Sequence, residues 1–185
     1  GFISIARANY QVRLPARFQL IAAMNPCPCG FFNSTDKQCR CSPEKIKKYQ
    51  SRVSGPLLDR MDLHVHVSQL RREEQEQLLA SDCHASETSD FARSRITEAR
   101  LRQLSRSSKS NTWLSQSEIR KTCQLESADE EYLKQAMNKL GLSTRGFFRV
   151  LKVARTIADL DSVDKIQRKH LAEAMTLRLP GMITD

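Results

Sequence analysis

The chain has 185 residues, of which 39% are hydrophobic and 28% are charged. This length holds one domain or two small ones, with a core that needs no disulfide or metal to support it. The apolar runs are too short to cross a membrane and the first residues do not resemble a signal peptide, so we expect a soluble protein of the cytoplasm with no membrane partner. Thirty basic and 21 acidic residues give a net charge of +9, which favours a polyanionic partner such as nucleic acid or nucleotide.

Two short β-prone runs, FISIA and FQLIAAM, flank a basic middle in residues 2–25. This pattern predicts a strand, then a hairpin or loop around Pro15, and then a buried strand at 18–24. The following stretch, 26–44, contains three prolines and four cysteines, so it is predicted to be an irregular loop.

A short basic helix and a second strand are predicted next. The sequence KIKKYQSRVSGPLL indicates a helix at 45–58 that is broken at Gly55-Pro56. The run MDLHVHV at 61–67 alternates apolar with polar side chains, which is typical of a buried or half-buried strand. Residues 1–70 are therefore predicted to be an α/β fragment.

The sequence after residue 70 predicts an all-α bundle. The polar stretch 71–90 is interpreted as a linker and residues 91–185 as a helical domain. Periodicity and caps predict five helices, at 90–104, 115–123, 127–141, 144–160 and 164–178. The expected caps are a capping box of Ser115 with Glu118, a second box of Ser127 with Glu130, and Gly141 as a stop.

Asn25 stands at the carboxyl end of the predicted strand 18–24. Open α/β sheets bind their ligands at that edge, and an amide there can donate to a phosphate oxygen and accept from a water. The alternative is that Asn25 only turns the chain before Pro26.

Three arginines are candidates for contacts with phosphate. Arg60 lies just before the predicted strand 61–67, where its guanidinium can either form a structural salt bridge or project toward a phosphate on a neighbouring subunit. Arg145 lies in the first turn of a predicted helix, and Arg149 lies on about the same face. A helix N-terminus favours anions, so a bound phosphate explains an arginine there better than the alternative of a solvated face.

Four cysteines are compressed into one loop with the pattern C-x-C-x9-C-x-C: Cys27, Cys29, Cys39 and Cys41. In a reducing compartment, four thiolates on one loop can close a structural zinc site. The usual zinc knuckle is C-x-x-C, and the alternatives for the tighter C-x-C pairs are two disulfides or four free thiols. His64 and His66 are further candidate ligands, although their spacing is also ordinary strand patterning.

The chain resembles the C-terminal part of the magnesium-chelatase-like AAA+ proteins of the ComM/YifB type. Three segments carry the resemblance: ISIARANYQVRLPARFQLIAAMNPCPCG, SRVSGPLLDRMDLHVHV and LSTRGFFRVLKVARTIADL. It implies that residues 1–70 are part of an AAA+ core, with 91–185 as its helical lid. It also implies the sensor 1 role for Asn25, the arginine finger for Arg60 and the sensor 2 role for Arg145, with Arg149 beside the nucleotide.

By the same resemblance, the full-length protein uses ATP and Mg²⁺ and assembles into a homo-oligomeric ring, expected to be a hexamer, that acts on DNA as a helicase or branch-migration motor. The hairpin before sensor 1 would point toward the pore of the ring. That hairpin region carries four candidates for nucleic-acid contacts: Arg7, Tyr10, Arg13 and Arg17. Guanidinium groups there would contact phosphates and a tyrosine could stack on a base, whereas the alternative is a solvated hairpin.

No P-loop of the form G-x-x-x-x-G-K-[ST] occurs, because none of the six glycines precedes a lysine. Nor does an apolar strand end in an Asp-Glu pair that would hold magnesium. We therefore expect a fragment that lacks the P-loop strand and does not hydrolyse ATP alone. By the resemblance, that strand lies between the two predicted strands, so the sheet part is expected to be less ordered or to pair through open edges, while the lid folds by itself.

Three functions remain as hypotheses. The first is the back half of an AAA+ motor that works on DNA. The second is the motor subunit of a magnesium chelatase, which drives metal insertion into a tetrapyrrole; the cysteine pairs fit the ComM-like branch better. The third is a zinc-stabilised nucleic-acid-binding module without a catalytic role, which predicts salt-dependent DNA binding by this chain alone.

Overall fold

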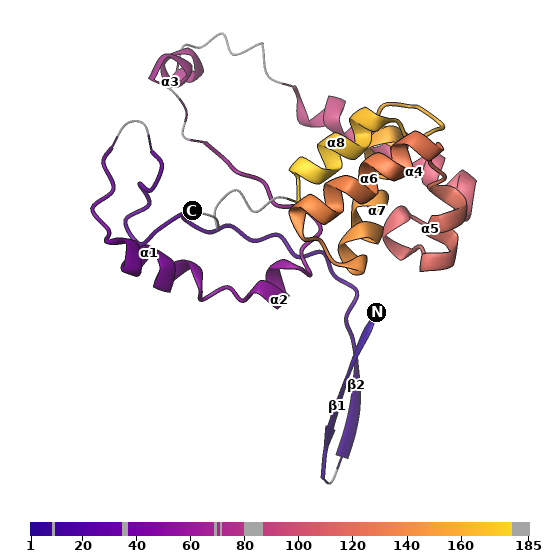
Figure 1. Ribbon diagram of the computed structural model, residues 1–185, viewed down its shortest axis with the longest axis horizontal. Coiled ribbons are helices and arrows are strands. Elements are labelled where there is room, and N and C mark those ends of the chain that lie inside the picture. Colours follow the sequence, from indigo (N-terminus) through magenta and orange to yellow (C-terminus); the bar gives the residue numbers. More distant parts are fainter. Residues whose placement is uncertain (9, 35–36, 69, 71, 80–86, 179–185) are drawn as a thin grey trace. The chain divides into compact units, whose positions relative to one another are not determined.

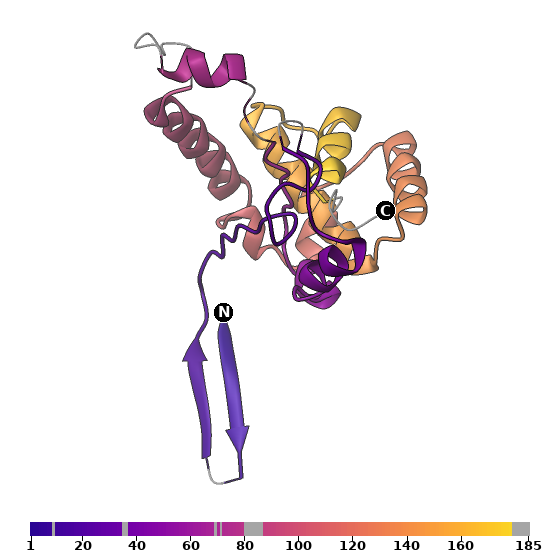
Figure 2. The same ribbon diagram turned by 90° about the vertical axis from the view of Figure 1, so that its left-hand side faces the viewer.

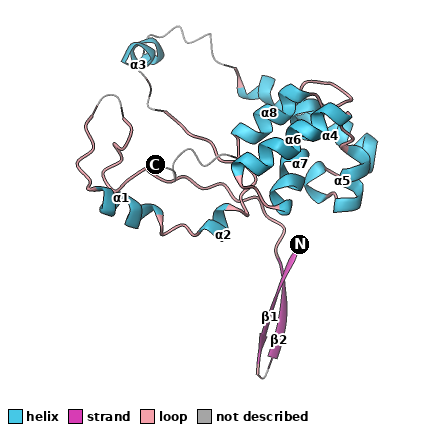
Figure 3. Cartoon of the chain, viewed as in Figure 1, coloured by secondary structure: helices cyan, strands magenta, loops and turns pink. Residues whose placement is uncertain are grey.

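The computed structural model describes residues 1–8, 10–34, 37–68, 70, 72–79 and 87–178. The chain forms two compact units, Gly1–Gln50 and Ser51–Asp185. The first unit contains a two-stranded sheet and one helix, and the described part of the second is helical (Figures 1 and 3). A mixed α/β chain that ends in a helical domain agrees with the prediction at this coarse level.

The sheet is an antiparallel hairpin of β1 (Phe2–Arg7) and β2 (Tyr10–Pro15), whose strands lie side by side in Figure 2. The predicted first strand is confirmed, but the predicted loop around Pro15 is wrong. The chain reverses between Arg7 and Tyr10, and Pro15 ends β2, where its missing N–H costs no interior ladder bond. This register pairs Ile5 with Val12 and so gathers apolar side chains on one face of the hairpin.

The two further strands that the sequence predicts, at 18–24 and 61–67, are not formed. An extended segment becomes a strand only when a neighbouring backbone pairs with its N–H and C=O groups. Within the described residues the only ladder is that between β1 and β2, and both segments expose apolar side chains such as Ile21 (84% exposed) and Val67 (83% exposed). The periodicity therefore indicates segments with strand character. The described residues, however, contain no strand that pairs with them.

The predicted basic helix is two helices. In the first unit, α1 (Pro43–Gln50) buries Ile46 and ends before Ser51. In the second unit, α2 (Gly55–Leu58) begins at the predicted break. Its proline lies in the first turn, where the backbone N–H groups have no partner within the helix, so the missing N–H of proline costs no hydrogen bond.

The helical unit then continues through α3 (Arg72–Leu79), α4 (Ser89–Ser107), the 3₁₀ turn η1 (Asn111–Trp113), α5 (Gln116–Thr122), α6 (Ser127–Leu140), α7 (Thr144–Leu160) and α8 (Arg168–Thr176). The five predicted helices are α4 to α8. The stretch interpreted as a linker contains α3. No helix in the described ranges combines the length and the apolar character that crossing a membrane requires.

The caps decide where these helices begin and end. Ser115 and Glu118 form the predicted capping box of α5, and Gly141 ends α6 in the left-handed conformation with φ of 61°. The predicted box at Ser127 is wrong, because α6 begins at Ser127 itself and the residue before it, Glu126, makes no side-chain cap. Ser143 caps α7 by accepting from the N–H of Gly146.

Helix α7 is the centre of the core of the helical unit. It packs against α8, α4, α5 and η1. Its predicted apolar stripe is confirmed, because Leu151, Ala154 and Ala158 are buried and Phe147 packs against them half-buried. Burying apolar surface stabilises such a core by about 25 cal/mol per Å². Because most of this surface packs around α7, this helix organises the unit that contains the predicted finger and lid arginines.

Candidate functional site

The four cysteines of the loop lie together. Their sulfur atoms all lie within 4.8 Å of one another, and the Sγ separations are 3.3 Å for Cys27 and Cys29, 3.7 Å for Cys27 and Cys39, and 3.5 Å for Cys29 and Cys39. All four are free thiols, so the structure has neither of the two disulfides that were an alternative. Cys27 is fully buried and the other three are half-buried.

Local hydrogen bonds give the loop this shape. The N–H of Gly30 donates to the carbonyl of Cys27 at 3.0 Å, and Gly30 has a φ of 83°, which a side chain would disfavour. This turn directs Cys27 and Cys29 to the same point. From α1, the side-chain amide of Gln50 donates to the carbonyl of Pro26 at 3.1 Å and so fixes the start of the loop.

The sulfur geometry fits a tetrahedral metal. A Zn–S bond of about 2.3 Å places two sulfurs of a tetrahedral site roughly 3.8 Å apart, close to the three separations above. Among the described residues the four cysteines are the one such cluster, so His64 and His66 are not part of it. His64 instead has its Nε2 atom 3.1 Å from the carbonyl oxygen of Leu58.

The thiols differ in acidity. Backbone hydrogen bonds with Phe31 and then Arg40 lower the pKa of Cys29 to about 6. The backbone hydrogen bond with Cys41 lowers the pKa of Cys39, but burial and the neighbouring Cys29 and Cys27 outweigh it and raise that pKa to about 12. Burial also raises the pKa of Cys41. The pKa of Cys29 is therefore lowered, whereas those of Cys39 and Cys41 are raised, because a second negative charge close to the first is unfavourable.

Asn25 and Arg60 are both exposed, in different units of the chain. Asn25 ends the segment without strand partners, two residues before Cys27. Arg60 donates from Nη1 to the carbonyl of Pro56, 2.6 Å away in α2. None of the carboxylates in the described ranges pairs with Arg60, so the salt bridge that was its alternative role is not formed.

The two arginines of α7 have different surroundings. Arg145 is exposed in the first turn and makes no ion pair with any described residue. Arg149, one turn later, is half-buried: Nη1 donates to the carbonyl of Asp59 and, at 3.3 Å, to that of Met61, and Nε lies 3.5 Å from the Asp62 carboxylate. These contacts occupy Arg149 and favour a structural role over the predicted place beside a nucleotide.

Arg178, which the sequence did not single out, binds the same segment from the end of α8. Its Nη1 donates to the carbonyl of Met61 at 2.8 Å and its Nη2 lies 3.4 Å from the Asp59 carboxylate. The N–H of His64 donates to the carbonyl of Leu177 at 2.6 Å. We name the set formed by Arg149, Arg178 and the segment Asp59–His64 the finger clamp, because the segment contains Arg60, which the sequence predicts to be an arginine finger.

A buried ionic network joins α4, η1 and α7. The carboxylate of Asp159 accepts from Arg106 at 2.7 and 2.8 Å, from Asn111 at 2.9 Å and from Nε of Arg155 at 3.2 Å. Arg155 and Asp159 are 1% and 2% exposed. The sequence did carry a signal for it, since an Arg and an Asp four residues apart interrupt the apolar stripe of α7.

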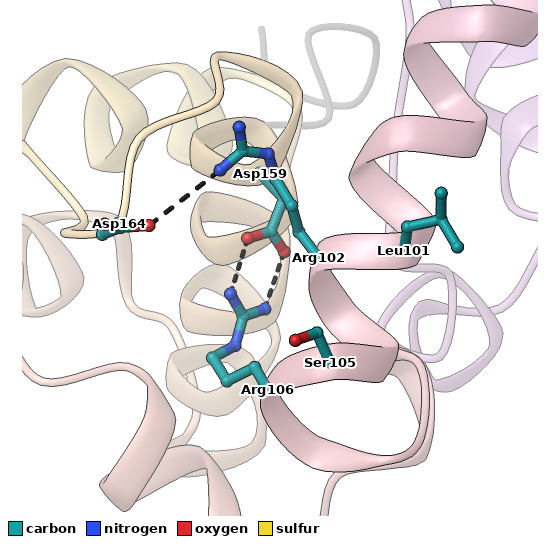
Figure 4. A pocket seen from close by; sticks show the side chains of 6 residues that line it. All are labelled: Leu101, Arg102, Ser105, Arg106, Asp159 and Asp164. Atoms are coloured by element: carbon teal, nitrogen blue, oxygen red, sulfur yellow. Dashed lines mark hydrogen bonds and ion pairs between the residues drawn. The ribbon is translucent and has the colours of Figure 1, made fainter.

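Figure 4 shows one pair of this network at the wall of a pocket, with Arg106 directed at Asp159, and beside it Arg102 directed at Asp164. Arg102 and Asp164 are 4.0 Å apart and exposed, unlike the pair beside them. Because four donors already saturate Asp159, this carboxylate fastens helices together and has no capacity left for a ligand.

The hairpin separates its candidate residues onto two faces. Arg7 and Tyr10 are cross-strand partners at the turn, on the face that also carries Ile5 and Val12. Arg13 lies on the other face, with its guanidinium 3.2 Å from the centre of the Phe2 ring. Arg17 follows β2 and is exposed.

Two family profiles match the chain. The one described as "Magnesium chelatase, subunit ChlI" covers residues 1–75, and the one described as "Magnesium chelatase, subunit ChlI C-terminal" covers residues 86–178. Together they span the cysteine loop, the finger clamp and the helical bundle.

Similar proteins include "Competence protein ComM" of Haemophilus influenzae, with 44% identity over 178 residues, and "Uncharacterized protein YifB" of Escherichia coli, with 43% identity over the same length. Each alignment covers 96% of this chain and 34% of the relative. A protein of Mycobacterium tuberculosis is 33% identical over 98% of this chain and 35% of its own. The chain thus spans about a third of the length of these relatives.

Proposed function

Because the chain belongs to the magnesium chelatase ChlI family and matches its ComM/YifB type, we propose that it is the C-terminal part of an AAA+ ATPase module. In this proposal Asn25 is sensor 1, Arg60 is the arginine finger and Arg145 is the sensor 2 arginine of the lid. ATP and Mg²⁺ would bind with residues from the rest of the full-length protein, and the assembly is a homo-oligomer, proposed to be a hexamer.

The observation that carries the proposal is the state of Arg60 and Arg145. Both guanidinium groups are exposed and neither has a carboxylate partner among the described residues. Unpaired arginines at the surface of a packed helical unit are suited to bind the charge that develops on a transferred phosphoryl group. Arg149 and Arg155, which are already occupied by protein groups, are not.

Each of the three residues would make a different contact with the reacting groups. The Asn25 side chain would orient a water by accepting a hydrogen bond from it, while its amide N–H donates to a phosphate oxygen. Arg60 would stabilise the negative charge of the transition state, and Arg145 would hold the phosphate chain against the lid. Magnesium would supply further charge neutralisation when bound, through ligands in the rest of the full-length protein.

We further propose that DNA is the polymer on which the motor acts. The net charge of +9 and the pair of Arg7 with Tyr10 at the turn of an exposed hairpin support it. Arg7 would bind a backbone phosphate and Tyr10 would stack on a base, a combination that binds without reading sequence. Arg13, whose guanidinium already lies over the Phe2 ring, and Arg17 would add contacts to phosphates only.

The four cysteines are proposed to hold zinc as a structural ion. Three sulfur separations close to those of a tetrahedral zinc site, a fourth sulfur within 4.8 Å of the others and the fully buried Cys27 support a closed site with no position for a substrate. The ion would offset part of the negative charge of the four thiolates and would fix the loop that follows Asn25.

Metal analysis tests this claim. We expect about one zinc per chain in purified protein and none after Cys27 and Cys29 are both changed to Ser, because two thiolates do not retain a structural ion. Changing Cys123 to Ser, a buried cysteine of the helical unit, is the control and should leave the zinc content unchanged. Equal zinc in all three proteins, or none in any, would refute the site.

ATPase and strand-displacement assays on the full-length protein test the motor. Asn25→Ala and Arg145→Ala are each expected to lower ATP turnover about 10²-fold or more, because each removes a group aimed at the phosphates. DNA strand displacement should fall in parallel. The alternative is a zinc-stabilised nucleic-acid-binding module without a catalytic role, which is supported by the presence of the hairpin and the cysteine loop in one unit. It predicts salt-dependent DNA binding by the 185-residue chain and wild-type ATP turnover in both variants.

A further inference from the structure

The finger clamp fixes the backbone on both sides of Arg60. Asp59 and Met61 are its two sequence neighbours, and the guanidinium of Arg149 donates to the carbonyl of each. Arg178 donates to the Met61 carbonyl as well, at 2.8 Å. The side chain of Arg60 itself remains exposed and, among the described residues, donates only to the carbonyl of Pro56. The clamp thus holds the segment without using the guanidinium that the proposed reaction needs.

The same clamp connects the segment to both ends of the lid core. Arg149 belongs to α7 and lies one turn after Arg145, while Arg178 and Leu177 follow α8. Helices α7 and α8 pack against each other over the buried core, so the two arginines anchor the segment to one packed pair of helices. The position of the Arg60 backbone is therefore tied to the helix that carries Arg145.

Only arginine suits these two positions. The side chains of Arg149 and Arg178 are 19% and 4% exposed, and each guanidinium binds more than one acceptor of the segment. A planar fork with several donors can satisfy two carbonyls and a carboxylate at once, whereas an ammonium group is a compact point charge with strong hydration. If the segment left the lid, both buried cations would lose their acceptors, which makes separation costly.

We propose that Arg149 and Arg178 are positioning residues that hold the segment Asp59–His64 on the lid, so that the arginine finger moves together with the sensor 2 arginine. This role rests on the proposed function of Arg60. It replaces the place beside the nucleotide that the sequence suggested for Arg149. Movement of the lid would then carry Arg60 toward or away from the phosphates.

The test uses the full-length protein and two readouts. Arg149→Ala and Arg178→Ala are each expected to lower kcat for ATP hydrolysis about 10- to 100-fold, since a displaced catalytic group loses that much rate. In an Arg60→Ala background the same changes should lower kcat by less than about twofold further, because positioning acts only through Arg60. Arg149→Lys should behave like Arg149→Ala. Arg93→Ala, which removes an exposed ion pair of α4, is the control.

Hydrogen exchange gives a readout that does not depend on activity. Arg149→Ala should raise amide exchange about tenfold or more in peptides covering 60–66, where the His64 N–H binds Leu177, and leave α6 unchanged. Unchanged exchange at 60–66 would overturn the clamp. An equal loss of kcat with and without Arg60 would overturn the positioning role even if exchange rises. Wild-type turnover in Arg60→Ala alone would instead refute the proposed function, and the positioning role with it.

Discussion

Replacing Arg60 with alanine in the full-length protein is expected to lower ATP turnover at least about a thousandfold, because an arginine finger contributes about 10³ to 10⁵ in kcat. The guanidinium is available for this role because it is exposed and, among the described residues, donates only to the carbonyl of Pro56 in α2. Loss of that single exposed hydrogen bond should hardly change stability, so the effect should fall on kcat and not on the amount of folded protein. Steady-state ATPase measurements with matched thermal unfolding would check it.

Two further variants make this result specific. Arg60→Lys keeps the positive charge but lacks the planar fork, so it should recover little of the lost turnover. Arg100→Ala removes another exposed arginine of the helical unit and should retain turnover within about twofold of wild type, as surface substitutions usually do. If Arg60→Ala and Arg100→Ala behaved alike, Arg60 would have no role in hydrolysis.

Replacing Asp159 with alanine is expected to destabilise the helical unit by about 3–5 kcal/mol, because it leaves a buried charge without its partner. Arg155, whose side chain is 2% exposed, would lose the carboxylate, and Arg106 and Asn111 would lose the acceptor that joins α4 and η1 to α7. The midpoint of urea unfolding of the 185-residue chain measures the change. The one tryptophan, Trp113, lies in η1, so its fluorescence reports on this unit alone.

Asp164→Ala is the matched control for that experiment. The same substitution is made in the same pocket, but the Asp164 side chain is fully exposed and lies 4.0 Å from Arg102 (Figure 4). We expect a change within about 0.5 kcal/mol, as for other exposed ion pairs. A similar shift of the midpoint in both variants would mean that the network around Asp159 contributes no more than a surface pair.

Features that depend on residues close together in the chain could be predicted from the amino-acid sequence. The capping box of Ser115 with Glu118, the stop at Gly141 and the apolar stripe of α7 belong to this class, because caps and helical periodicity act within one or two turns. The cysteine pairs indicated a metal-type cluster for the same reason, since one short loop carries all four thiols.

Features that depend on residues far apart became visible only in the folded chain. The runs at 18–24 and 61–67 have strand periodicity, but a strand also needs a partner backbone, and among the described residues only β1 and β2 provide one for each other. The sequence predicts Arg149 as a second phosphate ligand, whereas its contact with Asp59, 90 residues away, depends on the packing of distant segments. Periodicity records which face of an element is apolar, whereas the partner of a guanidinium or of a strand edge is fixed only when distant segments pack together.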